Sequence, residues 1–215
     1  MMSSTLSAQE NTGTISGSVV LTSSSVVTRS SGRFGNPYQK RQNRESSQSS
    51  SQNKTVLIWL ERSGGSDHEL RNKPLKLNQK NKRFKPSVLP VIKGETVRIF
   101  NSDRVYHNVF SLSREKRFDV GRRPKGEYKD VTFNKTGVID VFCDIHSNMH
   151  AIIVVMPKNT YDWVERSDSG NFTFENVPPG RYTLKTVTIG FEMQSRDVGL
   201  KAGEKVSVES IRLER

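Results

Sequence analysis

The chain has 215 residues, with 34 Lys and Arg against 22 Asp and Glu, and its formal net charge of +12 predicts an acidic partner or surface. This length suffices for one large or two small domains, which excludes a peptide-like or metal-stapled mini-fold. Because Cys143 is the single cysteine, the chain cannot form an internal disulfide, nor a zinc ribbon or an iron–sulfur cluster by itself.

The N-terminal residues and the apolar runs bear on membrane targeting. No apolar run approaches the roughly 20 residues that a membrane-spanning helix needs, so no transmembrane span is expected. The first residues lack the basic and apolar regions of a complete signal peptide, although residues 3–9 resemble the small-residue end of one. Two interpretations of residues 1–13 stay open: a flexible polar tail, or the end of a longer export signal in which the first Met is internal.

The first predicted strand covers residues 13–21, and a run of β-branched and aromatic residues predicts the second at 54–61. Between them, residues 22–53 contain ten Ser and five Lys or Arg against one Glu. Such a segment cannot bury enough apolar area to offset its ordering entropy, so we expect a flexible basic loop. Its basic residues lack the interleaved aromatic side chains that stack on bases, so no specific nucleic-acid partner is expected.

A hairpin is predicted over residues 88–101, with strands at 88–92 and 96–101 joined by a turn. Two more strands follow at 137–143 and 151–156. In the first of these two, alternate residues share one face, which places the cysteine among apolar neighbours that face a core.

The last fifty residues repeat this pattern of short strands and turns, with strands predicted at 171–174 and 181–185. A final hairpin is predicted with its turn at residues 201–204. After this turn the apolar residues change parity, which predicts a one-residue bulge near Glu209 or Ser210. Because no long stretch has helical periodicity, the predicted fold class is all-β.

Four side chains form a candidate metal site. Cys143, His146 and Met149 fall in the connection between the strands predicted at 137–143 and 151–156. This short loop can place a thiolate, an imidazole and a thioether around one point, and His107 supplies a fourth ligand from a neighbouring loop. Two His and one Cys in a trigonal arrangement, with a weak axial Met, describe a blue-copper site.

The residue types favour copper. Zinc sites rarely use a thioether, whereas Cu(I) accepts both sulfur ligands and imidazole suits Cu(II). One copper ion that alternates between Cu(I) and Cu(II) is therefore the predicted cofactor. Taken alone, each residue also has a purely structural explanation, since a buried Cys or Met commonly fills a core. His150 is predicted to point to the face opposite Met149, where it could still support a ligand, and His68 to lie in solvent.

The same residues carry a resemblance to a known family. Cys143, His146 and Met149 have the short spacing seen in amicyanin, and residues 107–109 resemble the upstream ligand loop of cupredoxins. The wider segment, residues 80–155, looks like the bacterial cupredoxin-like proteins of the plastocyanin or methylamine-utilisation type. The resemblance implies a cupredoxin Greek-key sandwich for this part of the chain.

The resemblance also implies roles for neighbouring residues. Asn108 would tie the two ligand loops together by hydrogen bonding near the cysteine sulfur and so tune the reduction potential. The exposed edge of His146, with Ile145 and Asn148 around it, would form the electron-transfer surface. The family has Pro after this His, whereas this chain has Ser147, so loop stiffness and potential do not carry over from the family.

A second resemblance concerns the flanking segments. Residues 170–184 are similar to the transthyretin-like, carboxypeptidase regulatory-like β-sandwich, and the Gly17-Ser18-Val19 strand that would open such a module lies far upstream. We therefore predict one sandwich from residues 14–62 and 159–215, with a copper domain inserted at about residues 63–158. A tandem arrangement, in which the early strands join the cupredoxin sheet, stays open.

These observations favour a type 1 (blue) copper protein that acts as a one-electron carrier. Two alternatives stay open: a copper chaperone or storage protein without electron transfer, and a non-catalytic β-sandwich scaffold with a vestigial site. No enzymatic activity is expected, because four filled positions leave no open coordination for a substrate. The family resemblance implies the periplasm or cell envelope as the location, and the net charge predicts an acidic redox partner protein.

Overall fold

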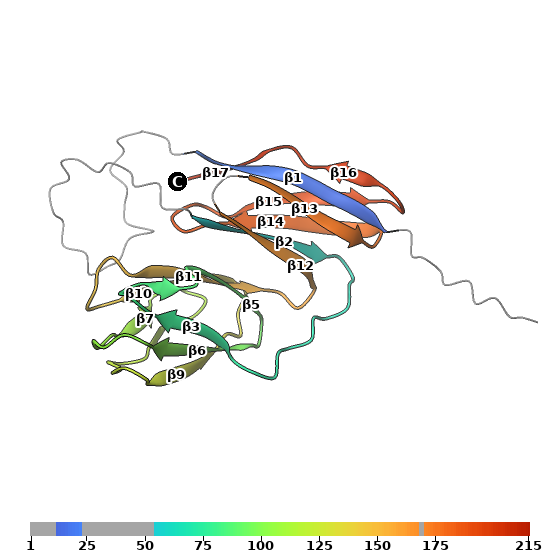
Figure 1. Ribbon diagram of the computed structural model, residues 1–215. Coiled ribbons are helices and arrows are strands. Elements are labelled where there is room, and N and C mark those ends of the chain that lie inside the picture. The colour runs from blue at the N-terminus through green and yellow to red at the C-terminus, as the bar shows by residue number, and fades with distance from the viewer. Residues whose placement is uncertain (1–11, 23–53, 168–169) are drawn as a thin grey trace, which may run out of the picture.

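The computed structural model describes residues 12–22, 54–167 and 170–215, and its regular elements in these ranges are all β-strands (Figure 1). The predicted all-β class is thereby confirmed. Most of the predicted tail and of the predicted Ser-rich loop lies outside the described residues. In the part of the chain that is described, no helix has the length and apolarity needed to cross a membrane.

The described residues form four sheets, and two of these sheets are built from the early and late strands of the chain. We call them sheet A and sheet B. Sheet A contains β13 (Gly170–Val177), β1 (Gly13–Thr22), β16 (Lys205–Ser207) and β17 (Ile211–Glu214). Sheet B contains β12 (Thr160–Ser167), β2 (Thr55–Arg62), β14 (Gly180–Val187) and β15 (Gln194–Leu200). Segments on both sides of the central part of the chain are therefore joined by strand pairing.

The central part of the chain forms the other two sheets, sheet C and sheet D. Sheet C contains β5 (Val88–Ile92), β11 (His150–Met156), β10 (Gly137–Cys143), β7 (Val109–Ser111) and β8 (Phe118–Asp119). Sheet D contains β4 (Phe84–Lys85), β3 (Leu75–Gln79), β6 (Thr96–Asn101) and β9 (Tyr128–Thr132).

The four sheets stack in the order A, B, C, D, from top to bottom in Figure 1. One hydrophobic cluster lies between sheets A and B, a second between B and C, and a third between C and D. Because β2 and β11 belong to the inner sheets, both of their faces are covered, and they read as continuous apolar runs rather than alternating ones. The stack therefore consists of an A–B sandwich and a C–D sandwich packed face to face.

The predicted hairpin over residues 88–101 is wrong. Its two strands exist, but β5 pairs in parallel with β11 in sheet C, whereas β6 pairs with β3 and β9 in sheet D. The turn at Lys93 therefore carries the chain from one sheet to the next. The burial patterns give the reason. Every residue of β5 is buried, because β5 packs against other layers on both of its faces. In β6 partly buried and buried residues alternate, because only one face of β6 packs against another sheet. Pro90 is tolerated because β5 is an edge strand.

The final predicted hairpin is wrong for the same reason. Residues 201–204 do form a tight turn, in which the Glu204 N–H donates to the Lys201 carbonyl at 3.2 Å. However, β15 before the turn belongs to sheet B, and β16 after it pairs in parallel with β1 in sheet A. Apolar side chains of both strands pack in the shared A–B core. This turn therefore connects the two sheets of the A–B sandwich instead of joining two paired strands of one sheet.

The predicted one-residue bulge is confirmed by the strand register. β16 pairs with β1 so that Thr14 faces Lys205, and β17 pairs with the same strand so that Val19 faces Ile211. The step of five residues from Thr14 to Val19 in β1 thus corresponds to a step of six residues from Lys205 to Ile211. The extra residue falls between the two strands, where it turns the later apolar side chains back toward the A–B core.

Candidate metal centre

The fold brings His107, Cys143 and His146 together. The Cys143 sulfur lies 3.7 Å from Nδ1 of His107 and 3.9 Å from Nδ1 of His146, and the two nitrogens are 3.1 Å apart. Cys143 ends β10, where it faces Val109 of β7 in the ladder of sheet C. This pairing is what brings a histidine 36 positions earlier in the chain to the cysteine.

The spacing of these three atoms fits a metal ion. Atoms at these separations leave a point about 2.1 Å from each of them, which is close to metal–nitrogen bonds of about 2.0–2.1 Å and a metal–sulfur bond of about 2.3 Å. In the described part of the chain, one group of three or more His, Cys, Asp or Glu side chains has its possible ligand atoms within 4.8 Å of one another. This group is the trio of His107, Cys143 and His146. The donor set, one sulfur and two imidazole nitrogens, suits copper.

His107 is fully buried, and its two ring nitrogens have different neighbours. Nδ1 faces the sulfur, whereas Nε2 lies 2.8 Å from a carboxylate oxygen of Asp103. The backbone of His107 exchanges two hydrogen bonds with Arg123, at 3.2 and 2.8 Å, so the loop that carries the ring is fixed at the backbone as well.

His146 is only partly buried and lies at the outer side of the trio. Burial, followed by the neighbouring His107 and Lys82, lowers the pKa of His146 below its ordinary value of 6.5. A metal requires the neutral imidazole, so this environment favours the form that binds. Ile145, 40% exposed, and the exposed Asn148 flank this histidine on the surface, where the electron-transfer surface is predicted.

Met149 is buried in the core between sheets C and D, the same hydrophobic cluster that contains Cys143. Its backbone N–H donates to the His146 carbonyl at 3.0 Å, which closes the ligand loop into a turn and orients the side chain inward. The prediction that Cys143 faces this core is confirmed, since its side chain is fully buried there beside Ile139 and Val141.

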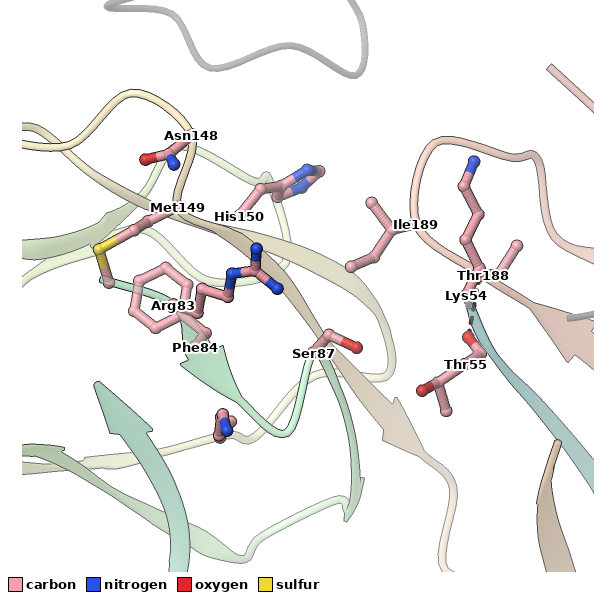
Figure 2. A pocket seen from close by; sticks show the side chains of 11 residues that line it. Lys54, Thr55, Arg83, Phe84, Ser87, Asn148, Met149, His150, Thr188 and Ile189 are labelled. Carbon is pink, nitrogen blue, oxygen red and sulfur yellow. Dashed lines mark hydrogen bonds between the residues drawn. The ribbon is translucent and has the colours of Figure 1, made fainter. Parts of the chain in front are cut away.

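His150 points away from the trio, as predicted. Its Nε2 lies 2.7 Å from Asp140, and its ring stacks on Phe142 across the ladder. His150 also lines a cavity of about 640 Å³ between the two sandwiches. Figure 2 shows it there together with Met149. Arg83 reaches into the same cavity. His68 was predicted to be solvated; it is half-buried, and its ring lies near Trp163.

Asn108 connects the two ligand loops. It is almost completely buried, and its side-chain amide donates to Asp144, the residue after the cysteine, at 3.2 Å. The bond joins the loop that carries His107 to the loop that carries His146. Its predicted effect on the reduction potential stays a prediction.

Sequence reasoning missed two residues that hold the His107 loop. Asn101 is fully buried, and its amide donates to the carbonyls of Val105 and Arg123 at 2.8 and 2.9 Å. The side-chain oxygen of Asn101 accepts a hydrogen bond from the backbone N–H of Asp103. The carboxylate of Asp103 in turn forms the hydrogen bond with the His107 ring. An Asn followed two residues later by Asp at the end of a strand is a turn signal, and it could have marked this bracing.

No protein-family model and no curated protein match the chain. Similar solved structures include a copper-containing nitrite reductase (NirK) from Thermus scotoductus SA-01, at 24% identity and a TM-score of 0.39, covering 44% of this chain and 25% of that one. A reduced tryptophan-to-tyrosine mutant of amicyanin is 20% identical over 45% of this chain and 98% of its own, with a TM-score of 0.38.

A purple cupredoxin from Nitrosopumilus maritimus is 21% identical over 38% of this chain and 99% of its own, with a TM-score of 0.35. Each of these matches covers less than half of this chain, and the match spans about a quarter of the nitrite reductase. What the candidate site can bind is therefore inferred from its own side chains and not from these similar structures.

Proposed function

We propose that this protein binds one copper ion through His107, Cys143 and His146, with Met149 as a weak axial ligand, and that it carries single electrons. The observation that supports this proposal is the convergence of one buried sulfur and two Nδ1 atoms within 3.9 Å of one another. Bound copper would supply the one-electron chemistry by alternating between Cu(I) and Cu(II).

The protein's own contribution is to hold the ligands and exclude water. Cys143 and His107 are fully buried and Met149 is 1% exposed, so three of the four proposed ligands are shielded from solvent. All four are carried by strands or short loops of the C–D sandwich, whose packed core resists rearrangement. A site that keeps its geometry when the charge of the ion changes suits electron transfer.

His146 is the proposed exit for the electron, because it is the one of these four ligands with an exposed edge. The proposed partner is an acidic redox protein, which the net charge of +12 would attract over distance. This steering predicts that the association rate falls as salt is added, since charges in solvent are screened beyond about 8 Å at physiological ionic strength. The predicted location in the periplasm or cell envelope and the absence of an enzymatic activity belong to the same proposal.

Copper titration of the metal-free protein tests the function. We expect uptake of one equivalent of copper and an intense visible thiolate band at roughly 600 nm, which disappears reversibly on reduction. Stoichiometric uptake without this band would favour a copper chaperone or storage protein. No stoichiometric uptake would favour a scaffold with a vestigial site.

A further inference from the structure

The carboxylate of Asp103 lies directly behind the buried ligand His107. One carboxylate oxygen is 2.8 Å from Nε2 of His107, on the side of the ring that faces away from the sulfur. The His107 ring is fully buried and the Asp103 side chain is 12% exposed. Water therefore has little access to this hydrogen bond.

The same carboxylate is held from the other side by a turn of sheet D. Asn81 and Lys82 form the two-residue turn between β3 and β4, and both have positive φ values, of 56° and 53°. Their backbone N–H groups point outward and donate to the two oxygens of Asp103 at 2.6 and 2.8 Å. The backbone N–H of Asp103 itself donates to Asn101 at 2.8 Å. Asp103 is thus fixed at its backbone and at both carboxylate oxygens.

This arrangement decides which nitrogen of His107 can bind a metal. A carboxylate whose two oxygens already accept backbone N–H groups is an acceptor, so the ring nitrogen facing it must carry a proton. In the neutral ring that a metal requires, Nε2 then carries the proton and Nδ1 carries the lone pair, beside Cys143. A carboxylate bonded to the distal N–H also makes the ring a stronger electron donor.

We propose that Asp103 is a positioning residue for the metal centre: it holds His107 in the tautomer and orientation that present Nδ1, and it favours Cu(II) over Cu(I) by increasing the donor strength of that nitrogen. This inference rests on the proposed copper function. It also links the exposed Asn81–Lys82 turn to a buried ligand through a single side chain.

The first test needs neither a variant nor copper. In metal-free wild-type protein, ¹⁵N NMR of the His107 ring is expected to show the proton on Nε2 and none on Nδ1. A ring that carries its proton on Nδ1 overturns the proposal. This measurement decides what Asp103 does to the ring even if the wild-type protein takes up no copper, a result that would refute the proposed function alone.

The second test compares Asp103→Asn with Asp130→Asn. Asp130 is a matched control, because its carboxylate also accepts two hydrogen bonds, at 2.9 and 2.8 Å, but from Arg98 rather than from a proposed ligand. We expect Asp103→Asn to weaken Cu(II) binding about 10- to 100-fold and to raise the reduction potential. Asp130→Asn should leave both unchanged. Wild-type affinity and potential in a folded Asp103→Asn variant would overturn the proposal.

Discussion

Replacement of Cys143 by Ser separates the proposed metal chemistry from the stability of the core. The thiol is fully buried, with two ring nitrogens 3.7 and 3.9 Å away. Burial of a hydroxyl in place of an apolar group costs about 1–3 kcal/mol in protein interiors. Val141→Thr is the matched control, because Val141 is fully buried on the same face of β10 and the change also introduces a hydroxyl. In the metal-free state, Val141→Thr should lose about this free energy of unfolding and Cys143→Ser no more than this, because two ring nitrogens lie near the new hydroxyl.

Copper should then distinguish the two variants. At a copper concentration about a thousand times the Kd, a ligand that binds the folded state stabilises it by about 4.1 kcal/mol. For a chain of this size, about 2–4 °C per kcal/mol gives a rise in Tm of about 8–16 °C for wild type and Val141→Thr. If Cys143→Ser binds copper about 100-fold more weakly, the same copper concentration contributes only about 1.4 kcal/mol.

Thermal unfolding followed by circular dichroism, with and without copper, measures these differences, and the visible spectrum is recorded on the same samples. The wild-type protein and Val141→Thr should share the thiolate band, and Cys143→Ser should lack it. A Cys143→Ser variant with the full copper-dependent rise in Tm, or with a reversible copper couple, would show that the sulfur is not a ligand.

Three further perturbations test other parts of the structure. Met149→Leu should retain copper and raise the reduction potential, because a weak axial donor is lost; an unchanged potential in voltammetry would exclude Met149 as a ligand. Ile152→Ala should lower the free energy of unfolding by about 2–5 kcal/mol in urea titrations, because Ile152 is 2% exposed in the cluster between sheets B and C; a cost below about 1 kcal/mol would argue against tight packing of the two sandwiches. The hydrogen bonds from Arg98 lower the pKa of Asp130, so their stabilisation is present above the ordinary carboxyl pKa of about 3.9 and is lost as the pH falls through the lower folded value. The difference in Tm between wild type and Asp130→Asn should therefore narrow in strong acid, and a difference that widens there would contradict this assignment.

The sequence predicts strands where β1, β2, β5, β6, β10, β11, β13 and β14 lie, but it misses strands such as β3, β9 and β12, and it does not predict which strands pair. Alternation over residues 137–143 identified the face of β10 that meets the core, and the change of parity after Val208 identified a bulge. The turns at Lys93 and Lys201 were mistaken for hairpins. The apolar pattern of a strand indicates which of its faces are buried. It does not indicate which neighbouring strand it pairs with, because that depends on the sheet that the strand joins after the turn.

The candidate site shows the same division. Cys143, His146 and Met149 lie within seven positions, so a single loop sets their relation, and a sequence reader can recognise it. The approach of His107 depends on the ladder between β7 and β10, and its orientation depends on Asp103, which an Asn–Lys turn of another sheet holds in place.

Residue types and their spacing along the chain thus predict the all-β class and four candidate ligands, of which the fold brings His107, Cys143 and His146 together. The stacking of the four sheets and the carboxylate behind the buried histidine become visible only in the folded chain. Donor chemistry and strand periodicity are properties of neighbouring residues, so they can be recognised along the chain. Sheet partners and buried hydrogen bonds are chosen by the burial and polar satisfaction of the whole chain.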